Sequence, residues 1–319
     1  MPRRAWLALL AVVLVVLPFA LKGYTIYILS IAGANVLAAV GLNLLMGYAG
    51  QVSIGHAAFL AIGGYTSALL MTKLGLEFWL ALPLAGVLTS LTGLILFIPA
   101  LRLSAIYLAI ATLGFGAAVQ QLIPLPYWSA VFGGHQGIKV PRLQIAGFVF
   151  DTDWELYYLT LVVVLALLIV SWNVARSYIG RAFIALRDKP AAAEALGINP
   201  TKYKAYAFVL SAFLTGIAGA LHAHLVVHIS PGEFGLGKSI EIFAMVILGG
   251  IGSLPGSIFG ALLLTFLPHW LAQAKLLYTF LYGAALVLVI IFMPYGVWGF
   301  FVRLYYRFPA VQKLFPKGA

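Results

Sequence analysis

Long apolar runs recur from Trp6 to Gly299, and they restrict what this chain can fold into more than any other feature. Charged residues are 8% of the 319 residues and hydrophobic residues 63%. A soluble domain has about 25% charged and about 45–50% apolar residues. In lipid, only helices and closed barrels satisfy every backbone polar group, and the alternation of a barrel strand is absent here. The sequence therefore predicts an all-α fold, a single bundle of transmembrane helices over residues 1–319.

Hydropathy predicts about ten membrane segments. Two of them are short or rich in glycine, while a full span needs about 20 apolar residues. These two, 51–71 and 239–252, are either full spans or re-entrant pieces that are buried in protein or face water. No small-residue cleavage site is evident near Ala20, so we expect the first segment to be retained rather than removed as a signal peptide. The segments are 5–21, 24–46, 51–71, 78–98, 104–122, 156–174, 206–228, 239–252, 256–272 and 277–299.

The net charge of +11 comes from basic residues confined to a few loops and the two ends. This pattern is typical of topology control in a membrane protein and does not indicate nucleic-acid binding. The positive-inside rule places the basic loop 175–205 and both termini in the cytoplasm. The loop 122–155 contains Asp151 and Asp153, ends at Glu155, and is predicted to be external. Cysteine is absent, which excludes disulfides, zinc fingers and cysteine nucleophiles.

The stretch "GEFGLGKS" at 232–239 fits the P-loop pattern G-x-x-x-x-G-K-[ST]. A P-loop, however, belongs to a parallel sheet with a helix behind it, and the flanks here are membrane segments. The charge pattern also places this loop outside, where ATP is scarce, and the nearest candidate carboxylate for Mg²⁺, Asp151, lies in another external loop. We therefore expect a loop between two helices, with Lys238 at the interface, and no nucleotide site.

Two Gly-rich stretches, "GYAGQVSIG" at 47–55 and "GGIGSLPG" at 249–256, fall in opposite halves of the chain. Corresponding broken helices in two halves indicate a transport pathway. The alternative is a pair of close helix crossings, which small residues permit. Polar residues near the first break either line that pathway or tie helices together, and a catalytic Ser–His pair is a weaker idea because no acidic residue is nearby. The candidate pathway residues are Asn43, Gln51, Ser53, His56, Gly249, Gly250 and Ser253.

The basic loop contains a predicted short helix in "DKPAAAEALGINP", residues 188–200. Asp188 can cap it, Pro190 suits its first turn, and Gly197 can end it. A rigid helix on a membrane face suits insertion into a groove of a partner. The alternative is a solvated loop helix attracted to anionic lipid.

Near the predicted outer end of segment 206–228 lie His222, His224 and His228. Their spacing offers one good pair and no accompanying carboxylate pattern, so interfacial histidines are favoured over a metal site. Glu241 begins a membrane segment and is expected to pair with Lys238.

Four stretches resemble the permease subunits of branched-chain amino acid ABC importers, the LivH/LivM family. "GLNLLMGYAGQVSIGHAAFLAIGGYTSALL" at 41–70 resembles its signature, and "FGGHQGI" at 132–138 its external Gly-rich segment, with His135 where Ser or Thr is commoner. Residues 180–221, which begin with "GRAFIALRDKPAAAEALGINP", resemble the cytoplasmic loop and the following helix, and this loop sequence is more similar to the LivM branch than to the LivH branch. Residues 230–264, which open "SPGEFGLGKSIEIFAMVILGGIGSLPG", resemble the late glycine motif.

The resemblance implies a membrane subunit without catalysis or a cofactor of its own. Two related permeases would form a heterodimer, two cytoplasmic ATPases would bind ATP and Mg²⁺, and a periplasmic or extracellular binding protein would deliver the substrate. It also implies that the short helix couples the permease to the ATPases. The rival substrates are urea and short-chain amides, and the rival classes are an ion-coupled secondary transporter and an intramembrane hydrolase. The implied coupling residues are Arg187, Asp188, Glu194, Ala195 and Gly197.

Overall fold

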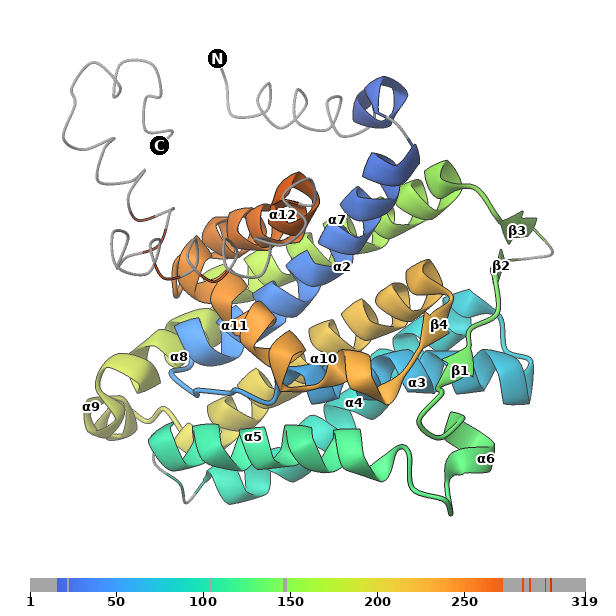
Figure 1. Ribbon diagram of the computed structural model, residues 1–319. Coiled ribbons are helices and arrows are strands. Elements are labelled where there is room, and N and C mark those ends of the chain that lie inside the picture. Colours follow the sequence, from blue (N-terminus) through green and yellow to red (C-terminus); the bar gives the residue numbers. More distant parts are fainter. Residues whose placement is uncertain are drawn as a thin grey trace, which may run out of the picture.

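The computed structural model describes residues 16–271 except 22, 102, 104, 146 and 147, together with four isolated positions further on. This part of the chain is a helix bundle, as predicted, and seven of its helices are long and apolar enough to cross a membrane (Figure 1). The first of them is α2, which a π-helical turn extends to Tyr48. The seven are α2 (Gly23–Asn43), α3 (His56–Leu74), α4 (Phe78–Ala100), α5 (Ala105–Leu122), α7 (Asp153–Arg176), α10 (Pro200–Val226) and α12 (Leu254–Leu271).

The predicted count of about ten membrane segments is not confirmed. Segment 5–21 lies mostly, and segment 277–299 almost wholly, outside the described residues. Segment 239–252 corresponds to α11, Leu236–Gly249, whose 14 residues are fewer than the about 20 that a full span needs. Segment 51–71 begins with residues 51–55 outside any helix and becomes helical only at His56. Segment 51–71 therefore contains the 19-residue candidate span α3, whereas 239–252 is shorter than a full span.

The centre of the bundle is α10, which packs on α2, α3 and α4. Small residues bring these helices together. A Cβ added to Gly219 would lie 2.0 Å from the carbonyl oxygen of Leu60, and one added to Gly63 would lie 2.0 Å from that of Gly216. Without a hydrophobic driving force between helices in lipid, such close packing is a main source of their association.

The periphery is formed largely by α4, α5 and α7. A capping box begins α7, in which Thr152 and Glu155 bond reciprocally to each other's backbone N–H groups. These helices expose large apolar side chains such as Ile95 on α4, Ile106 on α5 and Val162 on α7. Their outward faces match a hydrocarbon environment.

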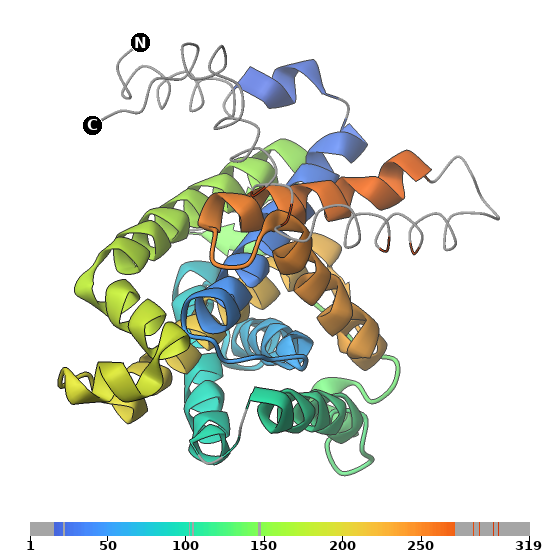
Figure 2. The same cartoon turned by 90° about the vertical axis from the view of Figure 1, so that its left-hand side faces the viewer.

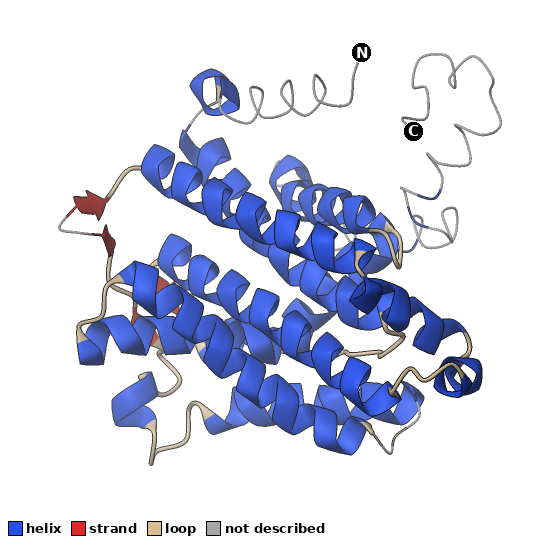
Figure 3. Ribbon diagram, turned by 180° about the vertical axis from the view of Figure 1, so that it is seen from behind, coloured by secondary structure: helices blue, strands red, loops and turns tan. Residues whose placement is uncertain are grey.

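The two ends of the bundle differ. One end, called the loop end, carries the short helix α6 (Ser129–Phe132) and two small antiparallel sheets. Strand β1 (Ile138–Lys139) pairs with β4 (His228–Ile229), and β2 (Leu143–Ile145) pairs with β3 (Phe148–Phe150). The opposite end, called the α9 end, carries α8 (Tyr178–Asp188) and α9 (Pro190–Ala195) (Figures 1 and 3). The two loops that the charge pattern predicted to be external therefore meet at one end, away from the basic loop.

Candidate functional site

The predicted short helix exists as α9, Pro190–Ala195, and forms a knob on the α9 end (Figure 2). Pro190 opens it, and Gly197 follows it with φ +84°, as the sequence predicted. Ala193 is buried, whereas Glu194, Ala195 and Gly197 are exposed. Next to them, Leu196 is 82% exposed. An apolar side chain this exposed on a polar loop, beside exposed predicted coupling residues, suits a partner's groove.

The predicted cap of this helix is wrong. Lys189 occupies the N-cap position without a side-chain bond, and Asp188 is the last residue of α8. The stretch before it continues as helix because Phe183 and Leu186 are buried on one face of α8. The Asp188 carboxylate instead accepts a hydrogen bond from Arg187 Nε at 2.8 Å.

Arg187 lies between the knob and the inside of the bundle. Its Nη1 donates to the carbonyl oxygen of Gly47 at 2.5 Å. A helix leaves its last four carbonyls without intrahelical partners, and a cation there also interacts well with the helix dipole. Arg187 therefore satisfies the broken end of α2.

The first Gly-rich stretch breaks α2 after Tyr48 and continues as residues 49–55, with no regular structure. Gly50 has φ +69°, a conformation that favours glycine. Gln51 donates to the carbonyl of Ala49 at 3.3 Å. At the end of the stretch, a Cβ on Gly55 would lie 1.7 Å from the carbonyl oxygen of Thr112 on α5. The break thus ends in direct backbone contact with another helix.

The second Gly-rich stretch is a tight turn, residues 250–253, between α11 and α12. Gly249 and Gly256 pack against each other across it, since a Cβ on Gly249 would lie 2.1 Å from the carbonyl oxygen of Gly256. Gly250 and Gly252 have φ of +120° and +77°. The helices α11 and α12 therefore cross closely at this stretch, while a role of its residues in a transport pathway stays a prediction.

Asn43 joins the two breaks. Its side chain is fully buried. Its Nδ2 donates to the carbonyl of Ser253 at 2.9 Å and to Ser257 Oγ at 2.6 Å, and its Oδ1 accepts from Gly252 N–H at 2.8 Å. Of the candidate pathway residues, the structure thus brings Asn43 together with the turn from Gly249 to Ser253.

Ser53 and His56, which are 1% and 0% exposed, bond to each other and to α10 rather than to that group. Thr215 donates its hydroxyl hydrogen to the carbonyl of Ser211 at 2.9 Å, so its oxygen accepts from His56 Nε2 at 2.9 Å. The ring is then left to accept from Ser53 at Nδ1, across a long 3.5 Å. In the described part of the chain, hydroxyl groups rather than a carboxylate orient the His56 ring. His56 therefore ties α3 to α10, and Ser53 and His56 do not resemble a catalytic dyad.

The P-loop match at 232–239 has no P-loop surroundings within the described residues. The strand before it, β4, has two residues and pairs antiparallel. Ser239 is buried and its Oγ accepts from Ala57 N–H at 3.1 Å. Lys238 pairs with Glu241 at 3.1 Å, as expected. Both residues that would contact phosphate and Mg²⁺ are thus occupied by the bundle itself.

The histidines at the end of α10 fasten the loop end to the bundle. His224 is buried: it donates from Nδ1 to the carbonyl of Pro141 at 3.2 Å and accepts at Nε2 from Ser67 at 2.9 Å. His228 is exposed and donates to the carbonyl of Gln136 at 2.9 Å. Among the residues described, no group of three His, Cys, Asp or Glu could hold a metal.

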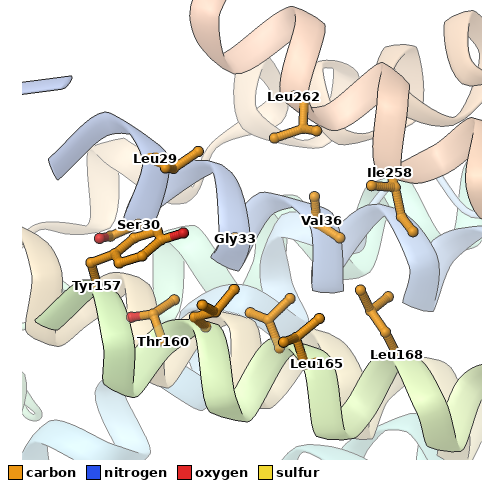
Figure 4. Close-up of a pocket in the computed structure, with 12 residues that line it drawn as sticks. Leu29, Ser30, Gly33, Val36, Tyr157, Thr160, Leu165, Leu168, Ile258 and Leu262 are labelled. Carbon is orange, nitrogen blue, oxygen red and sulfur yellow. The ribbon is translucent and has the colours of Figure 1, made fainter. Parts of the chain in front are cut away.

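A cavity of about 120 Å³ lies between α2, α7 and α12 (Figure 4). Its walls are mainly leucine, isoleucine and valine, with Ser30, Tyr157 and Thr160 on one side. Ser30 bonds to the carbonyl of Ile26 in its own helix. None of the candidate pathway residues lines this cavity, whose apolar walls do not suit the charged groups of an amino acid.

Sequence reasoning missed Leu196, Ser257 and the hydroxyls around His56. Leu196 carried one available signal, a large apolar residue in a polar loop. The others carried none, because their partners are more than 150 positions away in the chain.

Comparison with known proteins identifies the family. The protein-family model described as "Branched-chain amino acid transport system / permease component" matches residues 24–292. The chain belongs to this family. It is 33% identical to the branched-chain amino acid permease LivM of Salmonella typhimurium, in an alignment covering 92% of this chain and 75% of the relative. The figures for LivM of Escherichia coli are the same, and LivH of Escherichia coli is 26% identical over 82% of this chain and 90% of the relative. No solved structure matches.

Proposed function

We propose that this protein is the membrane subunit of an ATP-driven importer for branched-chain or related amino acids. The observation that carries the proposal is the family match over residues 24–292. The two-ended bundle supports it, because an importer of this kind needs one surface for an energy source and another for substrate delivery.

We further propose that the energy comes from two separate ATPase subunits, which bind ATP and Mg²⁺. The knob on α9 is their docking element, because Leu196 is exposed beside Glu194, Ala195 and Gly197. Positive residues dominate the surrounding loop, which supports a cytoplasmic α9 end and cytoplasmic termini in an inner-membrane protein. The basic residues of the loop are Arg176, Arg181, Arg187, Lys189, Lys202 and Lys204.

The other partners follow from the same arrangement. The chain has both LivM and LivH among its relatives, so a second, related permease is the proposed heterodimer partner. The loop end, with its two small sheets, is the proposed docking surface for an external substrate-binding protein. The path itself is proposed to run beside the two breaks, with Asn43, Gln51, Ser53 and His56 at the first and Gly249, Gly250 and Ser253 at the second.

Reconstitution tests this function. The protein is reconstituted in lipid vesicles together with the ATPases, the second permease and the binding protein that neighbouring genes encode. Uptake of labelled leucine is then measured with and without ATP. Uptake that needs ATP and the binding protein is expected. Uptake of urea or acetamide instead of leucine would change the substrate class, and uptake driven by an ion gradient without ATP would overturn the proposal.

The docking element has its own test, Leu196→Ala. We expect about a five- to thirtyfold loss of affinity for the ATPases, since a buried apolar anchor at an interface is worth about 1–2 kcal/mol. The control is Leu74→Ala, at the opposite end and 67% exposed, which should leave affinity unchanged. Equal affinity of the Leu196 variant and the wild type would remove α9 as the docking element.

A further inference from the structure

We propose that Arg187 transmits movement of the α9 knob to both helix breaks, and so acts toward the inside of the bundle rather than as a contact for the ATPases. This inference rests on the proposed function. It assigns Arg187 as a positioning residue for the transport step.

The first observation is its contact with the α2 break. Besides the bond from Nη1 to the Gly47 carbonyl at 2.5 Å, the stem of the side chain packs on Gly50, where an added Cβ would lie 2.9 Å from Arg187 Cγ. The side chain is only 35% exposed, although Arg187 lies in the last turn of a helix on the surface of the bundle. Arg187 therefore holds the broken helix both through its guanidinium group and through its aliphatic part.

The second observation is its place beside the other break. A Cβ on Gly252 would lie 3.2 Å from Arg187 Nη1 and 3.4 Å from the carbonyl oxygen of Gly47. Gly252 is in turn bonded to Asn43. One guanidinium group thus lies where the end of α2 and the turn 250–253 meet. A displacement of Arg187 would therefore change the contacts of both segments.

The third observation is the short connection from Arg187 to the knob. Only Lys189 lies between α8 and α9, and Ala193 of α9 is buried. Phe183 and Leu186 seat α8 on the bundle. A force on α9 therefore acts on the end of α8, where Arg187 lies, because only one residue separates the two helices. The left-handed glycines at positions 50 and 252 provide backbone that can change conformation at the receiving side.

The experiment replaces Arg187 in the assembled transporter. Arg187→Met keeps the aliphatic stem and removes the guanidinium group. Arg187→Lys keeps the cation but has a single nitrogen in place of the separate Nε and Nη1 that reach Asp188 and Gly47. The matched control is Arg181→Met on the same helix, whose guanidinium bonds only locally, to the carbonyl of Arg176 at 3.1 Å. ATPase association, ATP hydrolysis and leucine uptake are measured for each.

A direct reporter of the turn is Ile251→Cys, introduced with and without the Arg187 change. Ile251 is 55% exposed on the turn, and the chain has no other cysteine. In the wild-type background, its labelling rate by a soluble maleimide should change between the nucleotide-free and ATP-bound complex.

For Arg187→Met we expect ATPase association as in the wild type, uptake per ATP hydrolysed reduced by about tenfold, and an Ile251→Cys labelling rate that no longer responds to ATP. Arg187→Lys should fall between, and serves alone if the Met variant does not assemble. Normal uptake per ATP with an unchanged labelling response would overturn this inference. Absence of ATP-driven uptake in the wild-type complex would instead overturn the proposed function.

Discussion

The two Gly-rich breaks look alike in sequence, but one glycine in each, Gly55 in the first and Gly252 in the second, is required for a different reason. At the first break, Gly55 is needed because the backbone of α5 occupies the space of a side chain. At the second, Gly252 is needed mainly for its left-handed conformation, since the nearest atom to an added Cβ is the end of the Arg187 side chain. Gly55 thus marks a steric junction and Gly252 a turn position, within breaks that also contain the left-handed Gly50 and the closely packed Gly249. Asn43 holds the two breaks together.

The largest expected effect is that of Gly55→Ala. The added methyl group would lie 1.7 Å from the carbonyl oxygen of Thr112, so α3 and α5 must move apart, at a cost of about 3 kcal/mol or more. Thermal unfolding in detergent and the yield of folded protein measure this loss. The control is Gly114→Ala on α5, where an added Cβ meets nothing within 4 Å. Similar behaviour of the two variants would show that the junction is not tight.

Asn43→Ala should have the next largest effect. It leaves the N–H of Gly252 and the carbonyl of Ser253 without their side-chain partner, at about 1–3 kcal/mol of unfolding free energy. Asn35→Ala is the matched control, because that amide is equally buried and donates to Thr265 at 2.9 Å. The same measurement in detergent should rank Asn43→Ala below Asn35→Ala in stability, and the reverse order would mean that the breaks are not joined through Asn43.

The existence of both breaks could be predicted from sequence because it depends on local composition. Glycine beside serine weakens a helix wherever it stands, and the knob after Arg187 was likewise visible as Pro190 followed by strong helix formers. The cap at Asp188 was predicted wrongly because the buried face of α8, set by Phe183 and Leu186, extends that helix to residue 188. A local rule does not include such tertiary contacts.

The contacts at the breaks could not be predicted in the same way. Asn43 was recognised as polar in an apolar helix, but its partners are more than 200 positions away. Their approach depends on how α2, α11 and α12 pack together. The same holds for His224 on α10, because the loop that brings it the carbonyl of Pro141 lies 83 positions away, and its return to α10 is a property of the whole fold.

Gly252→Ala should have a smaller effect than either variant above if the second break is chiefly a turn. A non-glycine residue in the left-handed region costs roughly 1–2 kcal/mol, and the Arg187 side chain can move aside. Gly75→Ala separates the two contributions, because Gly75 has φ +64° and an added Cβ there meets nothing within 4 Å. Thermal unfolding of both variants should give similar losses. A much larger loss for Gly252 would mean that the second break is as tightly packed as the first.

The smallest effect should be that of Ser53→Ala, inside the first break. Its hydroxyl lies 3.5 Å from His56 Nδ1, near the limit for a hydrogen bond, so its removal should change the free energy of unfolding by less than about 0.5 kcal/mol. Thr215→Val is the comparison, because it removes the acceptor that lies 2.9 Å from His56 Nε2 and leaves this buried N–H only the longer contact with Ser211 Oγ at 3.2 Å, at about 1 kcal/mol. If Ser53→Ala proved the more costly variant, the ring would carry its proton on the other nitrogen, and the first break would be held by Ser53 rather than by α10.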